Sequence, residues 1–234
     1  MSTRALEGKK IAILVETEFI PEEIAAYQTR FPELGATVHI MSRLWGNQSV
    51  RFVSDVDSVE EADRINRQET SLPTLEVNID FQNVDVNEYA AIIMAANYTS
   101  VRLRYFQAPQ GQPISPEHTR TAPAVQFFAK AMANPKIIKG LLCHGLWLLT
   151  PMPELLKGRR VICHEVVLAD IVNAGAIYVP SPTNIVVDGD LVTGRSGGDV
   201  NAFINAIAQQ IVRQEQGVSL LAYEQTVLQA AAIG

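Results

Sequence analysis

The sequence predicts one large α/β domain in which buried parallel strands alternate with helices. Continuous apolar runs such as Lys9–Val15, after its charged start, and Tyr89–Ala96 are typical of parallel strands that are buried on both faces. Helical periodicity is present as well, since Val125, Phe128 and Met132 fall on one helix face. A chain of 234 residues, with 47% hydrophobic and 19% charged residues, suits one such domain with additions better than two small domains.

The N-terminal segment predicts a β-α-β unit. Lys9–Val15 is expected to be a central first strand, and a helix should run from Pro21 to about Leu34. Proline suits the first turn of a helix because it lacks the amide that would be unpaired there, and Gly35 ends the helix. Ala36–Ser42 is then expected to be the second strand.

The next segment predicts an insertion followed by a return to the sheet. The apolar pattern is lost from Arg43 to Ser71, which indicates an extra hairpin and helix, and Ser58–Arg64 resembles a capped short helix. Leu75–Asp80 alternates as a half-exposed or edge strand does. The buried strand Tyr89–Ala96 ends in a polar loop, Asn97–Ser100, that suits the mouth of a binding site.

The second half of the chain predicts further alternation of helices and strands. The proline-rich loop 106–123 is expected to be a surface excursion near the site. The elements expected after it are a helix at 124–133, a strand at 137–142, a helix at 146–150, a strand at 159–164, a helix at 166–173, a strand at 176–179, a hairpin at 184–193 and a last core helix at 200–212. Residues 215–234 predict an added C-terminal helix.

Cys143 stands where a predicted strand passes into a predicted helix, which is the position of a nucleophile elbow. Gly145 would let the backbone and the helix approach closely, and N-terminal helix amides would lower the thiol pKa and hold an oxyanion. His144 follows directly, but consecutive side chains usually point apart, so it is not automatically the base. A buried structural cysteine explains the spacing equally well, and both interpretations stay open.

Two other segments could carry anionic or anion-binding groups. Glu18, Glu22 and Glu23 lie just beyond the carboxyl end of the first strand, where open α/β sheets place their sites, although carboxylates also occur there simply as favourable charges at a helix N-terminus. Gly194–Asp199 precedes the last core helix and could receive an anion or a carboxylate; the alternative is a glycine-rich connector.

Composition narrows the classes of partner. A net charge of −6 and a pI near 5.3, without a Lys/Arg cluster, argue against nucleic-acid binding and favour small or neutral partners. No apolar run approaches the roughly 18 residues that span a bilayer. The start of the chain lacks a signal-peptide core, and Cys143 and Cys163 are the only cysteines, so free thiols in a cytoplasmic protein are expected.

No cofactor or metal is predicted. The four histidines do not form a close-spaced ligand pattern, although residues distant in sequence could converge; they are His39, His118, His144 and His164. The sequence also lacks a phosphate-binding Gly-x-Gly-x-x-Gly and any flavin or nicotinamide signature.

At Ile137–Leu149 the sequence resembles the DJ-1/PfpI superfamily, whose members carry a strand, a Cys-His-Gly-type elbow and a helix. Segments 157–161, 170–179 and 188–195 also match, and their order and spacing resemble the PfpI branch. The resemblance implies a flavodoxin-like three-layer α/β/α sandwich with a mostly parallel sheet, of the class I glutamine amidotransferase type. It further implies a single domain with a core at about 9–212, insertions at 43–74 and 106–123, a C-terminal extension at 213–234, and a homodimer or higher homo-oligomer.

The resemblance also implies the residues of the site. A carboxylate from the loop after the first strand should touch the cysteine sulfur, and counting twelve residues back from Gly35 selects Glu23, with Glu22 and Glu18 as alternatives. A protonated carboxyl that donates to the thiolate would favour the ionised sulfur. The elbow histidine is His144, and His164 stands where relatives tend to have histidine. Where relatives have Pro-Gly-Gly, this chain has Ala95-Ala96-Asn97, whose amides can still form an oxyanion hole.

The function implied is that of a cysteine-dependent enzyme acting on a small carbonyl or amide compound, with Cys143 as nucleophile, Glu23 tuning its ionisation and His144 assisting. The superfamily is compatible with glyoxalase or deglycase chemistry, isonitrile hydration and intracellular peptide hydrolysis. Peptide hydrolysis is the weakest of these, because a peptide substrate needs an open groove to reach a cysteine at a narrow elbow. The alternative is a redox sensor or stress chaperone that uses the same oxidisable cysteine. A glutamine amidotransferase is disfavoured because no His-x-Glu pair stands near the final helix.

Overall fold

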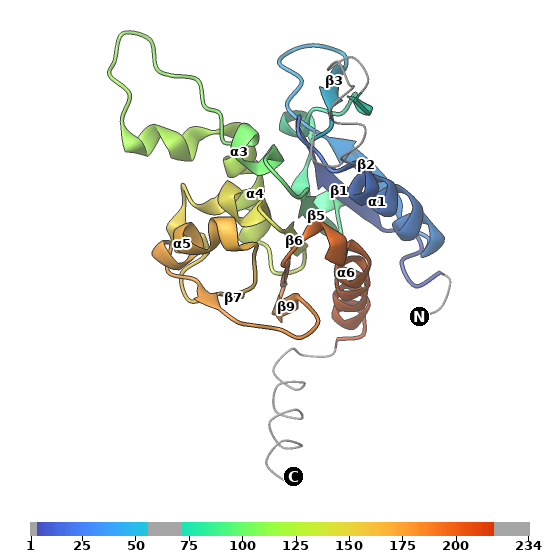
Figure 1. Cartoon of the computed structure of the whole chain (residues 1–234). Helices are drawn as coiled ribbons and strands as arrows, with labels where there is room; N and C mark the ends of the chain where they lie inside the picture. Colours follow the sequence, from blue (N-terminus) through green and yellow to red (C-terminus); the bar gives the residue numbers. More distant parts are fainter. Residues whose placement is uncertain (1–3, 56–71, 218–234) are drawn as a thin grey trace.

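A central sheet lies in the middle of the molecule (Figure 1). Among the described residues it has six strands, in the order β2-β1-β5-β6-β10-β9. The structure is a computed structural model that describes residues 4–55 and 72–217. All pairs in this sheet are parallel except β9 with β10, which are antiparallel. Its strands are β1 (Lys10–Leu14), β2 (Thr37–Met41), β5 (Ala91–Met94), β6 (Ile138–Leu142), β9 (Ile185–Asp188) and β10 (Leu191–Gly194).

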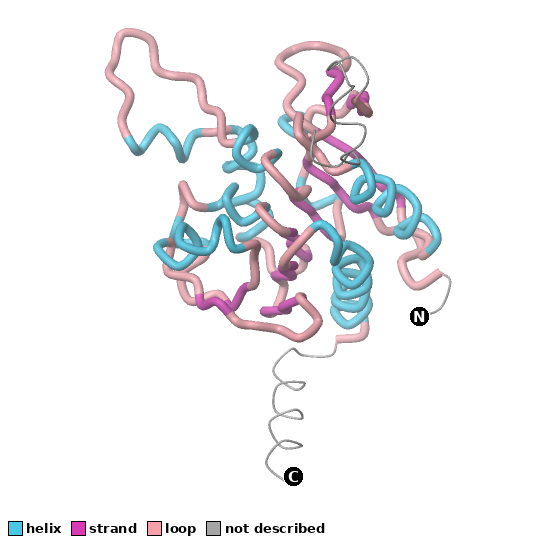
Figure 2. Tube along the Cα trace, in the orientation of Figure 1, coloured by secondary structure: helices cyan, strands magenta, loops and turns pink. Residues whose placement is uncertain are grey.

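Helices cover both faces of the sheet and complete a three-layer α/β/α sandwich (Figures 1 and 2). The long helices α1 and α6 pack against each other on one face, and the remaining α-helices lie on the other. The α-helices are α1 (Pro21–Glu33), α3 (Thr99–Leu103), α4 (Pro123–Met132), α5 (Glu165–Asn173) and α6 (Val200–Glu215). The short 3₁₀ helices are η2 (Phe81–Asn83), η3 (Val86–Glu88), η4 (Pro116–Thr121), η5 (Gly145–Leu149), η6 (Pro153–Leu155) and η7 (Gly197–Asp199).

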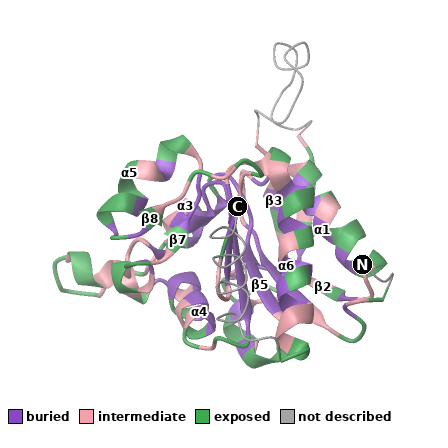
Figure 3. Cartoon of the chain, turned by 90° about the horizontal axis from the view of Figure 1, so that it is seen from below, coloured by how far each residue is buried: buried purple, intermediate pink, exposed green. Residues whose placement is uncertain are grey.

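The predicted flavodoxin-like fold is confirmed, and the apolar runs explain it. All residues of β5 and β6 are buried, because each of these central strands is covered on both faces (Figure 3). This explains their apolar sequences, in which Lys139 of β6 is the exception. Gly140 within β6 has a packing reason: a Cβ there would lie 2.8 Å from side-chain atoms of both Phe203 and Ile207 on α6. The glycine therefore lets α6 lie close against the sheet.

Two elements differ from the sequence-based expectation. The predicted strand 159–164 is only β7 (Arg160–Val161), which pairs with β8 (Ile177–Tyr178) in a separate two-stranded sheet. It stops because the next amide, that of Ile162, donates to Thr193 Oγ1 instead of continuing a strand ladder. The predicted helix 146–150 is the 3₁₀ helix η5, which is too short to have a strong dipole.

The hairpin expected within 43–71 is formed differently: only its first strand lies there, and its partner is the predicted edge strand 75–80, which is not part of the central sheet. Strands β3 (Val50–Val53) and β4 (Thr74–Val77) pair antiparallel outside the central sheet. The predicted short helix at 58–64 and most of the predicted C-terminal helix lie outside the described residues. The expected excursion 106–123 extends away from the body of the molecule and contains η4 (Figure 1).

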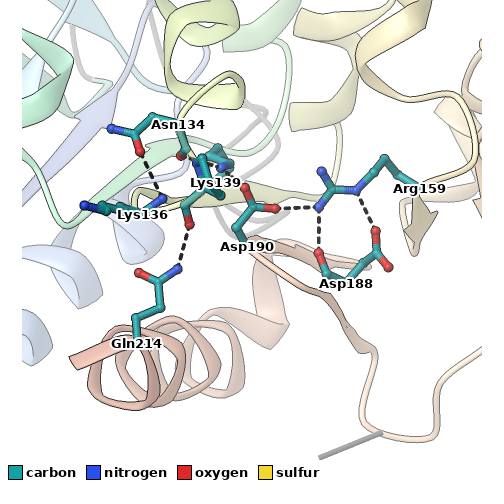
Figure 4. Close-up of polar contacts among 8 residues, drawn as sticks. Asn134, Lys136, Lys139, Arg159, Asp188, Asp190 and Gln214 are labelled. Carbon is teal, nitrogen blue, oxygen red and sulfur yellow. Dashed lines mark hydrogen bonds and ion pairs between the residues drawn. The ribbon is translucent and has the colours of Figure 1, made fainter. Parts of the chain in front are cut away.

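A buried ionic cluster ties β7 and the β9–β10 turn to the amino end of β6 (Figure 4). Lys139 is completely buried, pairs with Asp190 and donates to the carbonyl of Asn134 at 3.1 Å. Arg159 bonds Asp188 at 2.6 Å and Asp190 at 2.8 Å. This cluster holds the end of β6 opposite Cys143, so it supports the strand that carries the cysteine.

Every helix within residues 4–55 and 72–217 is too short or too polar to span a lipid bilayer.

Candidate active site

The chain turns sharply at Cys143, directly after β6. Its φ of 58° lies in the left-handed region, which is strained for any residue other than glycine and recurs at functional sites. The Cys143 amide donates to the carbonyl of Gly194 at 2.8 Å, and this bond fixes the turn to β10. Gly145 is needed for close approach, because a Cβ there would lie 3.2 Å from Leu141 Cβ and 3.4 Å from the Met94 carbonyl. The elbow predicted from the sequence is therefore present.

Within the described chain, three backbone amides face the Cys143 sulfur. They belong to Asn97 after β5, to His144 at the elbow itself and to Gly197 at the start of η7, and their hydrogen bonds lower the thiol pKa. The segment before α6 had two possible interpretations, an anion site or a connector. The position of Gly197 puts one amide of this segment at the sulfur.

Glu23 is the carboxylate that lies beside Cys143. It is fully buried; both of its oxygens accept from the Ala96 amide at 3.0 Å, and Oε1 also accepts from the Tyr27 hydroxyl at 2.7 Å. Its negative charge raises the pKa of the Cys143 thiol. The two alternative carboxylates lie elsewhere: Glu22 is exposed, and Glu18 pairs with Arg102 at 2.8 Å.

Burial dominates the ionisation of this pair. It raises the pKa of Glu23 to about 7, against the opposing hydrogen bonds from Tyr27 and Ala96. Burial, followed by the charge of Glu23, raises the pKa of the Cys143 thiol to about 11, although the three amides oppose this. The amides lower the thiol pKa as expected, but burial and the charge of Glu23 outweigh them. The protonated form of Glu23 that the resemblance implies predominates only below about pH 7.

The Ala96 amide does not serve as an oxyanion-hole donor, as the sequence had suggested, because it donates to Glu23. The amide one residue later, that of Asn97, faces the sulfur instead. Asn97 adopts a left-handed φ of 66°, and its side chain donates to the carbonyl of Glu18 at 2.9 Å and to Asp55. These bonds hold the turn that aims the amide.

His144 lies among aromatic rings rather than against the thiol. Its ring centroid is 5.2 Å from those of Tyr98 and Trp147 and 5.0 Å from that of His164. Burial and the neighbouring His164 lower its pKa to about 4, which leaves the imidazole neutral near pH 7. Neither ring nitrogen has a hydrogen-bond partner among the described residues, although the Asn97 backbone partly opposes the fall in pKa. Both ring nitrogens are buried, so the packing around His144 would have to open before a bound molecule could reach them.

His164 supports the elbow through its backbone. Its amide donates to the carbonyl of Cys143 at 3.3 Å, and its Nδ1 accepts from the Val166 amide at 3.2 Å and caps α5. The adjacent Cys163 is 1% exposed, and burial raises its thiol pKa to about 12.

Sequence reasoning missed Tyr27 and Ser100. Tyr27 lies four residues after Glu23 on α1, which is the spacing of side chains on one helix face, so this signal was available. Ser100 donates from Oγ to the His144 carbonyl at 2.9 Å, and no sequence pattern indicates that contact.

Two cavities lie beside the elbow. One of about 510 Å³ is lined by Tyr98 and Trp147, the rings that pack on His144, and the other, of about 930 Å³, lies across α3 from it. Cys143 is 7% exposed and lines neither of them, so access to the sulfur is narrow. Among residues 4–55 and 72–217 no three His, Cys, Asp or Glu side chains are grouped as metal ligands.

Comparison with known proteins gives a family model that matches part of the chain. The model of the DJ-1/PfpI family matches residues 109–210, which include Cys143, His144, His164 and Gly197. Over these residues the chain is similar to the DJ-1/PfpI family. Glu23 precedes the matched residues, so its assignment within this superfamily fold rests on the geometry above.

Relatives cover most of the chain at low identity. The protein named "Putative cysteine protease YraA" of Bacillus subtilis (strain 168) is 24% identical over 196 residues, which are 84% of this chain and 94% of that protein. A ThiJ/PfpI domain protein from Brachyspira murdochii has a TM-score of 0.64 and 16% identity, with 88% of this chain and 96% of that chain covered.

A two-domain protein from Anabaena variabilis, with DJ-1/ThiJ/PfpI-like and ferritin-like domains, has a TM-score of 0.66 and 21% identity. The match covers 87% of this chain and 48% of that one, so this chain spans about half of its length. These structural similarities concern the fold.

Proposed function

We propose that the protein is a cysteine-dependent enzyme of the DJ-1/PfpI type that acts on a small carbonyl or amide-like compound, with Cys143 as the nucleophile. The observation that carries the proposal is the pairing of a strained elbow cysteine with the buried carboxyl of Glu23, whose pKa is raised to about 7. A group that titrates near neutral pH can both accept and return a proton. The amides of Asn97 and Gly197 supply hydrogen bonds to the negative sulfur.

The roles of the residues follow from charge. Ionised Glu23 accepts the proton of the Cys143 thiol, and this transfer removes the negative charge that opposes the thiolate. The thiolate then attacks the electrophilic carbon of the substrate, and the electron pair of the carbonyl moves to its oxygen. Neutral His144 assists from beside the elbow, where its ring packs against Tyr98 and Trp147 and keeps this part of the site uncharged.

The restricted access to Cys143 favours a small substrate. A sulfur on a residue that is 7% exposed suits a two- or three-carbon carbonyl compound better than an extended peptide, which needs an open groove. Peptide hydrolysis remains the alternative that the name of the Bacillus subtilis relative raises.

A second candidate function is redox sensing or stress protection by reversible oxidation of Cys143. The same three amides would bond the oxygen atoms of a sulfenate or sulfinate. The raised thiol pKa of about 11 does not favour this function over the first, because attack on peroxide needs the thiolate just as attack on a carbonyl does. The homodimer or higher oligomer implied by the family resemblance stays a prediction for either function.

Turnover assays separate these candidates. Wild-type protein is offered methylglyoxal, a small amide and a fluorogenic peptide, beside Cys143→Ser and, as a matched control, Cys163→Ser. The proposal expects turnover of the carbonyl or amide compound by the wild type and by Cys163→Ser, and none by Cys143→Ser. Equal turnover by Cys143→Ser would overturn it. Absence of turnover together with reversible peroxide oxidation of Cys143 would favour the redox function.

A further inference from the structure

The larger of the two cavities, of about 930 Å³, has walls that the proposed catalytic chemistry does not use. We call it the aromatic cavity; the argument uses Trp45, Tyr105, Phe106, Ile114 and Arg104 among its lining residues. Its size falls within the range of pockets that bury small organic ligands, which is roughly 300–1,000 Å³.

One wall of the aromatic cavity exposes apolar rings in a fixed arrangement. Trp45 is 53% exposed and Tyr105 is 55% exposed, and their ring centroids are 5.2 Å apart in an edge-to-face contact. Trp45 adopts a left-handed φ of 56°, and the guanidinium of Arg43 lies 3.7 Å from its ring centroid. A strained backbone and a stacked cation therefore hold this ring out of the core, where exposed apolar surface indicates a ligand or partner.

Arg104 lines both the aromatic cavity and the smaller cavity, and it has no ion pair among the described residues. Its side chain is half-buried and donates to Thr150 Oγ1 at 2.8 Å, and no carboxylate in the described part of the chain lies within 4.0 Å of its guanidinium. Burial lowers its pKa, and the charge of Asp170, which is bonded to Trp147 at 2.7 Å, offsets this only in part.

Two other charged side chains line the aromatic cavity, Arg102 and Glu16, and burial raises the pKa of Glu16, which favours its neutral form. Arg102 pairs with Glu18 at 2.8 Å, and its charge also acts on Glu16 in the cavity wall. Arg120, on the excursion, pairs with Glu154. Because a half-buried cation without a counter-charge is unfavourable, Arg104 is the group there that an anionic ligand would stabilise.

We propose that the aromatic cavity binds an amphipathic organic anion, a monocarboxylate whose apolar body lies between Trp45 and Ile114 and whose carboxylate pairs with Arg104. Phe106 and Tyr105 cover the apolar body, and the planar guanidinium receives the carboxylate. This binding does not depend on Cys143 or on the proposed catalytic function, since the cysteine does not line the cavity.

Displacement of a fluorescent probe tests the proposal on the unmodified chain. The probe is 8-anilinonaphthalene-1-sulfonate, an aromatic anion, and the competitors are octanoate and 1-octanol, which share an apolar tail and differ in charge. Octanoate is expected to displace the probe at a concentration at least about tenfold below that of 1-octanol, since one charge-assisted pair contributes roughly one factor of ten or more. Equal displacement by both compounds, or no binding of the probe, would overturn the proposal.

Two matched arginine variants then test whether Arg104 is the cation that pairs with the carboxylate of octanoate. Arg104→Gln is expected to weaken octanoate binding at least about tenfold, whereas Arg120→Gln, which makes the same charge change at an exposed arginine already paired with Glu154, stays within about twofold of wild type. Circular dichroism checks that both variants fold. Wild-type affinity in Arg104→Gln, or an equal loss in both variants, would contradict the assignment; if Arg104→Gln does not fold, the comparison of octanoate with octanol still decides.

Discussion

The Tyr27 hydroxyl donates a 2.7 Å hydrogen bond to Oε1 of Glu23, one helical turn earlier on α1. Both side chains are completely buried, and the Ala96 amide bonds the same carboxyl. Tyr27 therefore fixes where the Glu23 carboxyl lies and favours its ionised form, while burial favours the neutral form. The proton affinity of the proposed site depends on the balance between these two effects.

Replacing Tyr27 with phenylalanine should raise the pKa of Glu23 further above about 7, because the variant loses a hydrogen bond that favours the carboxylate. A hydrogen bond to a charged group contributes about 1.5–3 kcal/mol, which corresponds to roughly one to two pKa units. Carbon-13 NMR titration of labelled glutamate carboxyls measures this. Tyr89→Phe, which removes a hydroxyl bonded to His39, is the control and should leave the Glu23 titration unchanged.

Glu23→Gln should change how stability depends on pH. The pKa of Glu23 is raised from 4.5 to about 7, so the native wild type binds more protons than the unfolded chain between these values, and its stability falls as pH rises through this window. At about 1.4 kcal/mol per pKa unit, the loss is on the order of 3 kcal/mol. Urea unfolding at pH 4.5 and pH 8 measures it. Glutamine removes this loss, whereas the exposed control Glu22→Gln keeps it; parallel pH dependences in wild type and Glu23→Gln would contradict the account.

Substitutions of Asn97 test the role of the turn that directs its backbone amide toward the Cys143 sulfur. Asn97→Ala and Asn97→Gly both lose the side-chain bonds to Glu18 and Asp55, but only alanine is strained at a φ of 66°. Alanine is expected to be less stable than glycine by on the order of 1 kcal/mol and to slow Cys143 alkylation more. Thermal unfolding and labelling rates measured on the pair check this, and the reverse order of stability would show that the turn is not strained.

The two thiols should differ in reactivity. The thiol pKa is about 11 for Cys143 and about 12 for Cys163, so at pH 8 the thiolate fraction of Cys143 is roughly tenfold larger. Cys143 is also the more exposed of the two, at 7% against 1%. Iodoacetamide labelling followed by peptide mass spectrometry should therefore modify Cys143 first. Equal rates would count against the assignment of the site.

The sequence was sufficient for the elbow and for the choice among the glutamates. The strand-to-helix transition at Cys143 is visible as an apolar run, a polar turn and a second apolar run, and the distance to Gly35 selects Glu23 within the resemblance. The structure adds the reason that Glu22 differs: adjacent residues on a helix point about 100° apart, and Glu22 lies on the exposed side of α1 whereas Glu23 lies on the buried side.

Other features of the site depend on tertiary packing that the sequence does not encode locally. The Asn97 amide replaces that of Ala96 at the sulfur because the backbone enters the left-handed region at Asn97. The sign of the thiol pKa shift depends on how completely α1, α6 and their loops bury the cysteine. Likewise, the strand predicted at 159–164 pairs with β8 outside the central sheet, since strand pairing is decided by the whole fold.

The pH dependence of Cys143 alkylation in wild type, Glu23→Gln and Glu22→Gln tests the Cys143–Glu23 pair most directly. Since the charge of Glu23 raises the thiol pKa, the neutral amide in Glu23→Gln should shift the alkylation profile to lower pH, even though the variant loses the group that accepts the thiol proton during turnover. Glu22→Gln should match the wild type. An unshifted profile in Glu23→Gln, or the same shift in Glu22→Gln, would contradict the account.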